Sequence, residues 1–123
     1  VTLGKVVAGG AMMGPAVESL SYPTTKTTSG LIMLSDTAAK PAPVSPCIRC
    51  GRCVEYCPMG LEPVEVNQAY AARDVQELGK LHVDYCFNCG SCSFVCPAKR
   101  PCTQMMGLAK AFYLGEIKKG GNK

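Results

Sequence analysis

The stretch CIRCGRCVEYCP, residues 47–58, decides how this chain folds, and a near-copy follows as CFNCGSCSFVCP, residues 86–97. Each copy places four cysteines in the spacing C-x2-C-x2-C-x3-C and ends in proline. Together the two copies use all but one of the chain's 9 cysteines. Two-cluster ferredoxins bind [4Fe-4S] clusters with this spacing. The sequence therefore predicts an electron carrier.

The spacing also predicts which cysteines share a cluster. Three cysteines at i, i+3 and i+6 can cover three corners of a cubane from one tight loop, and the fourth ligand must come from elsewhere. In two-cluster ferredoxins the last cysteine of each run binds the other cluster. We therefore expect two crossed ligand sets: Cys47, Cys50, Cys53 and Cys96 for the first cluster, and Cys57, Cys86, Cys89 and Cys92 for the second.

Zinc and disulfides are the chemical alternatives for these cysteines. Pairs of C-x2-C also form structural zinc sites, and many cysteines in a short secreted chain suggest disulfides. Three evenly spaced cysteines plus a fourth before proline favour a cubane over zinc. The odd number of cysteines and the lack of a signal-peptide pattern favour a reducing compartment over a disulfide framework.

Size and charge fit a small metalloprotein. With 123 residues the chain can build only a limited apolar core, so we expect cluster binding to supply folding energy and the apo-protein to be poorly folded. The formal net charge is +4. Two oxidised clusters with their thiolates would add about −4, which offsets this basic balance. We therefore expect no nucleic-acid partner.

Membrane and nucleotide motifs are absent from the sequence. No apolar run approaches the roughly 18 residues that a spanning helix needs, so we expect no direct membrane span. The glycines of residues 9–14 lack the spacing of a dinucleotide fingerprint, and Pro15 follows where a helix would begin. We expect no nicotinamide site in this stretch.

The chain is expected to have three parts. Residues 1–35 contain short apolar runs, near residues 5–8 and 30–34, bounded by turn residues, and predict a β-rich segment. Residues 36–46 contain three prolines and predict an extended linker. Residues 47–123 are expected to form a mostly α-helical domain that carries both clusters.

Helical signals lie between and after the cysteine runs. Pro63 suits the first turn of a helix that continues to about residue 73, and Asp74 can cap a second helix over residues 75–81. Thr103 can cap a last helix, whose apolar side chains recur at roughly helical spacing: Met106, Leu108, Ala109, Phe112 and Tyr113. Helices between the runs favour an α-helical ferredoxin domain over a small bacterial ferredoxin.

Several other residues could take part in a site. We interpret Cys102, the ninth cysteine, as a small buried apolar residue, with a ligand or redox thiol as the alternative. His82, the only histidine, is interpreted as structural. Basic residues near the runs form either a solvated face or a docking patch for an acidic redox partner: Arg49, Arg52, Lys99 and Arg100.

The residues around the first run resemble a known family. CIRCGRCVEYCPMGLEP, residues 47–63, followed by the second run, is similar to the C subunit of the Rnf electron-transport complex, a membrane-associated ferredoxin:NAD oxidoreductase. The stretches VAGGAMMG, residues 7–14, and TKTTSGL, residues 25–31, resemble that protein's β-grasp ligand-binding (SLBB) segment. The resemblance covers nearly the whole chain. Cys102 departs from it, because an apolar residue is common at that position.

The resemblance implies a place in a larger assembly. Such a protein lies peripherally on the cytoplasmic face of the membrane and carries two [4Fe-4S] clusters. It passes electrons between the complex's iron-sulfur B subunit and a flavin that reacts with NADH. The FMN and NADH sites of such proteins lie upstream of the stretch present here. The implied fold is a short β-grasp-derived segment followed by an α-helical two-cluster ferredoxin domain.

Other functions stay open at this point. A soluble reductase of the cobalamin-reductase or heterodisulfide-reductase kind could use a similar helical ferredoxin domain. A zinc-stabilised interaction module without redox function is the third hypothesis. In none of them does this segment contain a complete catalytic site, so we expect it to contribute electron transfer to a larger oxidoreductase.

Overall fold

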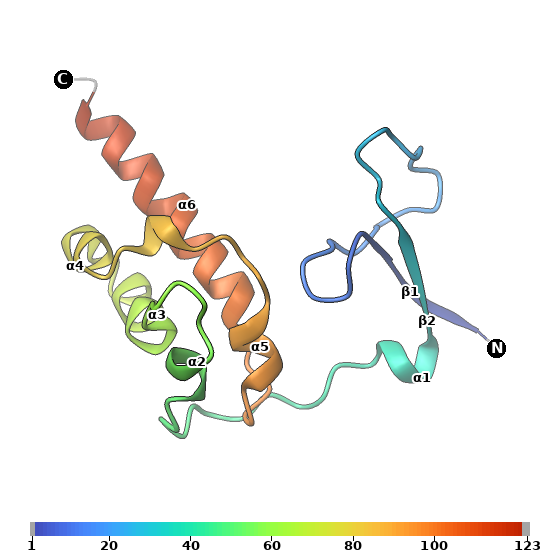
Figure 1. Cartoon of the computed structure of the whole chain (residues 1–123), viewed down its shortest axis with the longest axis horizontal. Helices are drawn as coiled ribbons and strands as arrows, with labels where there is room; N and C mark the ends of the chain where they lie inside the picture. The colour runs from blue at the N-terminus through green and yellow to red at the C-terminus, as the bar shows by residue number, and fades with distance from the viewer. Residues whose placement is uncertain (1, 122–123) are drawn as a thin grey trace. The chain divides into compact units, whose positions relative to one another are not determined.

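The computed structural model describes residues 2–121 and consists of two compact units, residues 1–43 and 44–123 (Figure 1). The first unit contains two strands and one short helix, and the second is helical. The structure therefore contains both predicted parts, a short segment with β-strands and a mostly α-helical domain.

The first unit is built on an antiparallel pair of strands, β1 (Leu3–Ala8) and β2 (Leu31–Ser35). They contain the two short apolar runs of the sequence, and Val6 and Val7 of β1 are buried. Helix α1 (Asp36–Ala39) follows β2 directly. It occupies the start of the stretch predicted as an extended linker, because the Ser35 hydroxyl accepts a hydrogen bond from the Ala38 amide and caps the helix.

The second unit contains five α-helices and one 3-10 helix among its described residues. In chain order they are α2 (Arg52–Glu55), α3 (Pro63–Ala71), α4 (Val75–Lys80), η1 (Val83–Tyr85), α5 (Ser91–Val95) and α6 (Cys102–Gly121). Helices α3 and α4 lie where the sequence predicted them. Pro63 is the first residue of α3, and the Asp74 carboxylate accepts a hydrogen bond from the Glu77 amide at the start of α4.

A single apolar core joins α3, α4 and α6 (Figure 1). Val66, Leu78 and Met106 are fully buried there, one from each helix. The predicted apolar face of the last helix is correct for Met106 and Ala109 but wrong for Leu108, which is 54% exposed. Leu108 is two residues from Met106, and two residues turn an α-helix by more than half a revolution.

The two cysteine runs belong to a longer structural repeat. Cys47 and Cys86 are equivalent positions, and the number of residues between them is the offset of the repeat. The same offset separates α2 from α5 and the first residue of α3 from the first residue of α6. Positive φ angles recur at the same offset, in three pairs: Arg49 and Asn88, Gly51 and Gly90, Gly60 and Lys99. The two halves therefore share one loop conformation from the first cysteine to the following long helix.

Candidate metal centres

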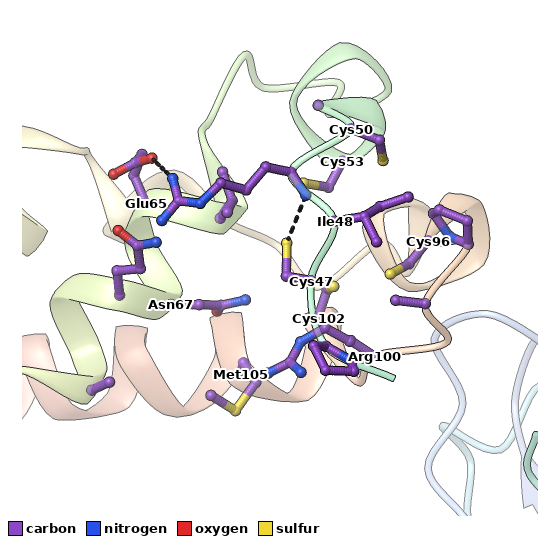
Figure 2. A pocket seen from close by; sticks show the side chains of 18 residues that line it. Cys47, Ile48, Cys50, Cys53, Glu65, Asn67, Cys96, Arg100, Cys102 and Met105 are labelled. Carbon is purple, nitrogen blue, oxygen red and sulfur yellow. Dashed lines mark hydrogen bonds and ion pairs between the residues drawn. The ribbon is translucent and has the colours of Figure 1, made fainter. Parts of the chain in front are cut away.

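The first expected ligand set borders one cavity of about 520 Å³. Its four cysteines, Cys47, Cys50, Cys53 and Cys96, come from two loops far apart in the sequence, and Figure 2 shows them around a common space. Cys47 and Cys50 are exposed, whereas Cys53 and Cys96 are half-buried. The structure thus brings the last cysteine of the second run to the first run.

The second expected ligand set borders another cavity. Cys57, Cys86, Cys89 and Cys92 line it, together with residues from the start of α3 and α6. This cavity is small, about 20 Å³, which is little more than the space of one water molecule. A four-iron core needs more room than this, so side chains that line the cavity would move apart when it binds.

The donor set suits iron-sulfur clusters better than single ions. Each cavity is bordered by four cysteines of the two runs, the ligand number that a [4Fe-4S] cluster takes from protein, and the first cavity is bordered by Cys102 as well. Within residues 2–121, no three cysteine, histidine or acidic side chains converge closely enough to hold one metal ion. A cubane binds each thiolate through a different iron, so its ligands surround a volume and do not meet at a point.

Backbone amides point at the sulfurs of the first site. The Arg49 amide donates to Cys47 Sγ at 3.4 Å, and the positive φ of Arg49 turns the loop in this way. Burial would raise the pKa of the Cys96 thiol, yet hydrogen bonds from the amides of Arg100 and Ala98, the Cys102 thiol and the Lys99 amide hold that pKa below its usual value. These dipoles favour a thiolate at the crossing cysteine.

Asn67 of α3 brings an amide group to the first cavity. In Figure 2 this group points toward Cys47. Its Oδ1 atom is buried and has no hydrogen-bond partner. A buried acceptor without a partner costs free energy, and only a hydrogen-bond donor can satisfy this oxygen. The sulfurs of a cluster are acceptors, so the group that can face them is the NH2 of the same amide.

Charged side chains surround the first site at its exposed edge. Arg49 Nη1 lies 3.9 Å from Glu65 Oε1, and both side chains are largely exposed (Figure 2). Arg100 lines the cavity as well and donates to the Ser45 carbonyl at 3.4 Å. Of the four basic residues considered from the sequence, Arg49 and Arg100 therefore border the first cavity.

The second site has more polar side chains next to its sulfurs. Cys86 and Cys89 lie 3.5 Å and 3.4 Å from the side chains of Asn88 and Ser91, and Thr103 Oγ1 lies 3.5 Å from Cys92 Sγ. Burial raises the pKa of Cys92, as it does that of Cys53 in the first site. These two thiols will lose their protons only when a metal compensates the buried charge.

Lys110 of α6 adds a positive charge close to the second site. Its Nζ donates to the Cys86 carbonyl at 2.6 Å from a partly buried position. This contact fixes the start of the second cysteine loop against the long helix. A positive charge at this place also offsets part of the negative charge of bound thiolates.

Cys102 is buried, as predicted, but it does not lie apart from the cluster sites. It begins α6 and borders the first cavity beside Cys96. Burial and the neighbouring thiols of Cys96 and Cys92 raise its pKa to about 12. Cys102 is therefore a protonated thiol at neutral pH. By the repeat it occupies the position of Pro63, which borders the second cavity in the same way.

His82 lies outside both cavities. It stacks on the Tyr85 ring, with the ring centroids 5.2 Å apart, and borders neither group of cysteines. Sequence reasoning did not identify Asn67, Ser93, Thr103 or Lys110 as neighbours of the sites. Aligning the two halves pairs Ser93 with Val54 and Thr103 with Val64, but their closeness to the cysteines depends on how α6 and α3 fold back on the runs.

A family of known proteins matches the part of the chain that contains both sites. Residues 46–99 match the 4Fe-4S dicluster domain family. This stretch contains both cysteine runs.

Curated relatives match a longer part of the chain than this family does. The C subunit of the ion-translocating oxidoreductase complex of Rhodobacter capsulatus is 40% identical over 77 residues, which is 63% of this chain and 15% of the relative. The C subunit of the Na⁺-translocating ferredoxin:NAD⁺ oxidoreductase complex of Acetobacterium woodii is 42% identical over 72 residues, 58% of this chain and 16% of the relative.

A third relative extends the match toward the first unit. The C subunit of the ion-translocating oxidoreductase complex of Buchnera aphidicola is 30% identical over 101 residues, which is 80% of this chain and 21% of that protein. The chain thus spans about a fifth or less of the length of these relatives. Between residues 2 and 121, none of the helices combines the length and apolar character needed to cross a membrane.

The glycine at the start of α2 provides a test of the loop conformation. Gly51 has a φ of +76° and no atom of the chain within 4 Å of where a side chain would start, so within the chain Gly51→Ala meets the cost of a left-handed backbone. Gly51 also lines the first cavity, so a bound cluster can only add to this cost. We expect a loss of about 1–2 kcal/mol of stability. Gly115 also faces open space but lies within α6, so Gly115→Ala should gain about 1 kcal/mol. Thermal unfolding of both cluster-loaded variants by circular dichroism measures these changes; equal shifts of the same sign would contradict the assignment.

Proposed function

Because the chain contains a 4Fe-4S dicluster domain and is similar to the C subunits of ion-translocating oxidoreductase complexes, we propose that it relays electrons through two [4Fe-4S] clusters. The observation that carries this proposal is the arrangement of the cysteines. The eight cysteines of the two runs border two cavities, and each cavity receives three of them from one run and one from the other. Crossed ligation of this kind brings two clusters close together.

The protein contributes ligands, position and electrostatics to this function. The clusters, when bound, supply the one-electron chemistry. Cys47, Cys50, Cys53 and Cys96 would hold the first cluster, and Cys57, Cys86, Cys89 and Cys92 the second. The amides near Cys47 and Cys96 and the ammonium of Lys110 compensate the negative charge of the thiolates.

The exposed edge of the first site is suited to electron exchange with another protein. Cys47 and Cys50 are exposed, and Ile48 between them is 69% exposed. An apolar side chain beside an exposed ligand allows close approach of a partner, and Arg49 and Arg52 favour an acidic one. Cys92 of the second site is buried. The first cluster is therefore the better candidate for direct transfer to a partner.

We propose that this partner is part of a membrane redox complex. The names of the relatives describe components of ion-translocating and ferredoxin:NAD⁺ oxidoreductase complexes. In such a complex the chain would accept or donate electrons at an iron-sulfur B subunit and exchange them with a flavin/NADH site outside this segment. It would lie peripherally on the cytoplasmic face. The full protein would then serve a translocase, while this segment transfers electrons.

Iron content tests the cluster assignment. Protein purified anaerobically should contain about eight irons per chain and absorb at about 400 nm. Reduction with dithionite should produce EPR signals from reduced clusters, because each site binds a one-electron carrier. A colourless, EPR-silent protein that contains zinc alone would disprove the assignment and support the zinc-stabilised module.

Cysteine variants test the crossed ligation. Cys102→Ala should retain about eight irons and provides a background in which this thiol cannot replace its neighbour Cys96. In that background, Cys96→Ser should leave the same remaining EPR signal as Cys47→Ser, because both remove a ligand of the first cluster. Cys57→Ser should match Cys86→Ser. If Cys96→Ser instead matches Cys86→Ser, each run binds its own cluster. Iron near four per chain in Cys102→Ala alone would make Cys102 a ligand.

Assembly distinguishes the membrane complex from a soluble reductase. We expect the full-length protein, tagged in its own organism, to co-purify with membrane-spanning subunits and another iron-sulfur protein after gentle detergent extraction. Washing the membranes with high salt should release it, because a peripheral contact rich in charges is screened by salt. Recovery in the soluble fraction with a cobalamin or disulfide substrate activity would support the soluble reductase.

A further inference from the structure

Thr103 places a hydroxyl group against the second set of cysteines. It is the second residue of α6 and lines the second cavity, where its Oγ1 lies 3.5 Å from Cys92 Sγ. The sequence suggested it as a helix cap. Because α6 begins one residue earlier, its side chain does not cap the helix, and Ser93 of α5 accepts its amide instead. The hydroxyl of Thr103 is therefore available to the site.

Two short hydrogen bonds determine the direction of this hydroxyl. The Thr103 amide donates to Ser93 Oγ at 2.8 Å, and the Ser93 hydroxyl donates to Thr103 Oγ1, also at 2.8 Å. A hydroxyl has only one hydrogen. Since Thr103 Oγ1 accepts from Ser93, its own hydrogen must go to another acceptor, and Cys92 Sγ is within reach. A metal-bound Cys92 is a thiolate and can only accept.

The other polar neighbours of the second site lack this constraint. The Cys89 and Cys86 thiols act as donors to Ser91 Oγ and Asn88 Oδ1 in the structure. To donate to a thiolate, the Ser91 hydroxyl and the Asn88 amide would have to turn. Only Thr103, among these three side chains, is oriented as a donor by a second group.

The first half of the repeat contains no such pair. Val54 corresponds to Ser93 and Val64 corresponds to Thr103. Each valine is separated from its counterpart by the same number of residues as Cys53 from Cys92. Val64 lines the first cavity as Thr103 lines the second. The same backbone therefore presents a methyl group to one site and a hydroxyl group to the other.

We propose that Thr103, oriented by Ser93, donates a hydrogen bond to the Cys92 thiolate and raises the reduction potential of the second cluster. This inference rests on the proposed function. Reduction adds a negative charge that the sulfurs share, so a donor stabilises the reduced state more than the oxidised state. Hydrogen bonds to the sulfurs are among the factors that set the potential of iron-sulfur clusters. Thr103 is thus a positioning and tuning residue and not a ligand.

Substitution by valine gives the second site the side chain of the first. Thr103→Val keeps the shape and the backbone bond to Ser93 but removes the hydroxyl. We expect the equilibrium constant for reduction of the second cluster to fall about threefold to tenfold, a shift of about 30 to 60 mV to lower potential. Thr103→Ser should titrate like the wild type. EPR-monitored redox titration of the cluster-loaded protein measures these values, and the signal of the first cluster should not move.

Two further variants separate tuning from a structural effect. Ser93→Ala removes the group that orients Thr103, so it should shift the same cluster in the same direction but by less. In the first half, the hydroxyl introduced by Val64→Thr has no serine partner, so this variant should leave both potentials unchanged. The double variant Val64→Thr with Val54→Ser adds that partner and should raise the potential of the first cluster. Iron content and far-UV circular dichroism identify any variant that does not fold.

The outcomes distinguish this inference from the function on which it rests. If wild-type protein binds no clusters, both fail. If two clusters form and Thr103→Val titrates like the wild type, or Thr103→Ser shifts as far as Thr103→Val, the tuning role of Thr103 is wrong while the relay remains. If Thr103→Val does not fold, an unshifted Ser93→Ala disproves the role.

Discussion

The position of Cys57 and Cys96 determines how the two halves of the second unit depend on each other. Each ends its own run yet borders the cavity of the other run. The chain then turns through a positive φ, at Gly60 or at Lys99, and begins a long helix within a few residues. Helices α3 and α6 therefore start next to the crossing points and pack against each other. Neither half could keep this geometry alone, because each cavity lacks its fourth thiol without the other.

This arrangement explains how a small core can suffice. The fully buried side chains of the second unit are few, and the cysteines surround them. Burial raises the pKa of Cys53 and Cys92, so these thiols keep their protons until a metal replaces them. The proposed clusters would add to the free energy of folding, since ligand-metal bonds would join segments that apolar contacts alone join weakly. Acid would oppose cluster binding by protonating the same thiols.

The sequence was most informative where local chemistry decides the structure. The cap at Asp74 and Pro63 at the first turn of α3 follow from residues within a few positions of one another. Leu108 shows the limit, because helical spacing alone did not place it outside the core. The contact between Thr103 and Ser93 was also not predicted. It depends on where α6 begins relative to α5, which no local pattern specifies.

The repeat gives two sites with one backbone and different surroundings. Equivalent positions hold Val64 and Thr103, and Ala71 and Lys110, so the second site has a hydroxyl and an ammonium where the first has hydrocarbon. A relay needs such a difference, because electrons move in one direction only if the two carriers differ in potential or in access to partners. Exposure differs as well, since Cys47 and Cys50 reach the surface and Cys92 does not. The loops therefore fix where the clusters can lie, and side chains outside the cysteine runs decide how unlike they are.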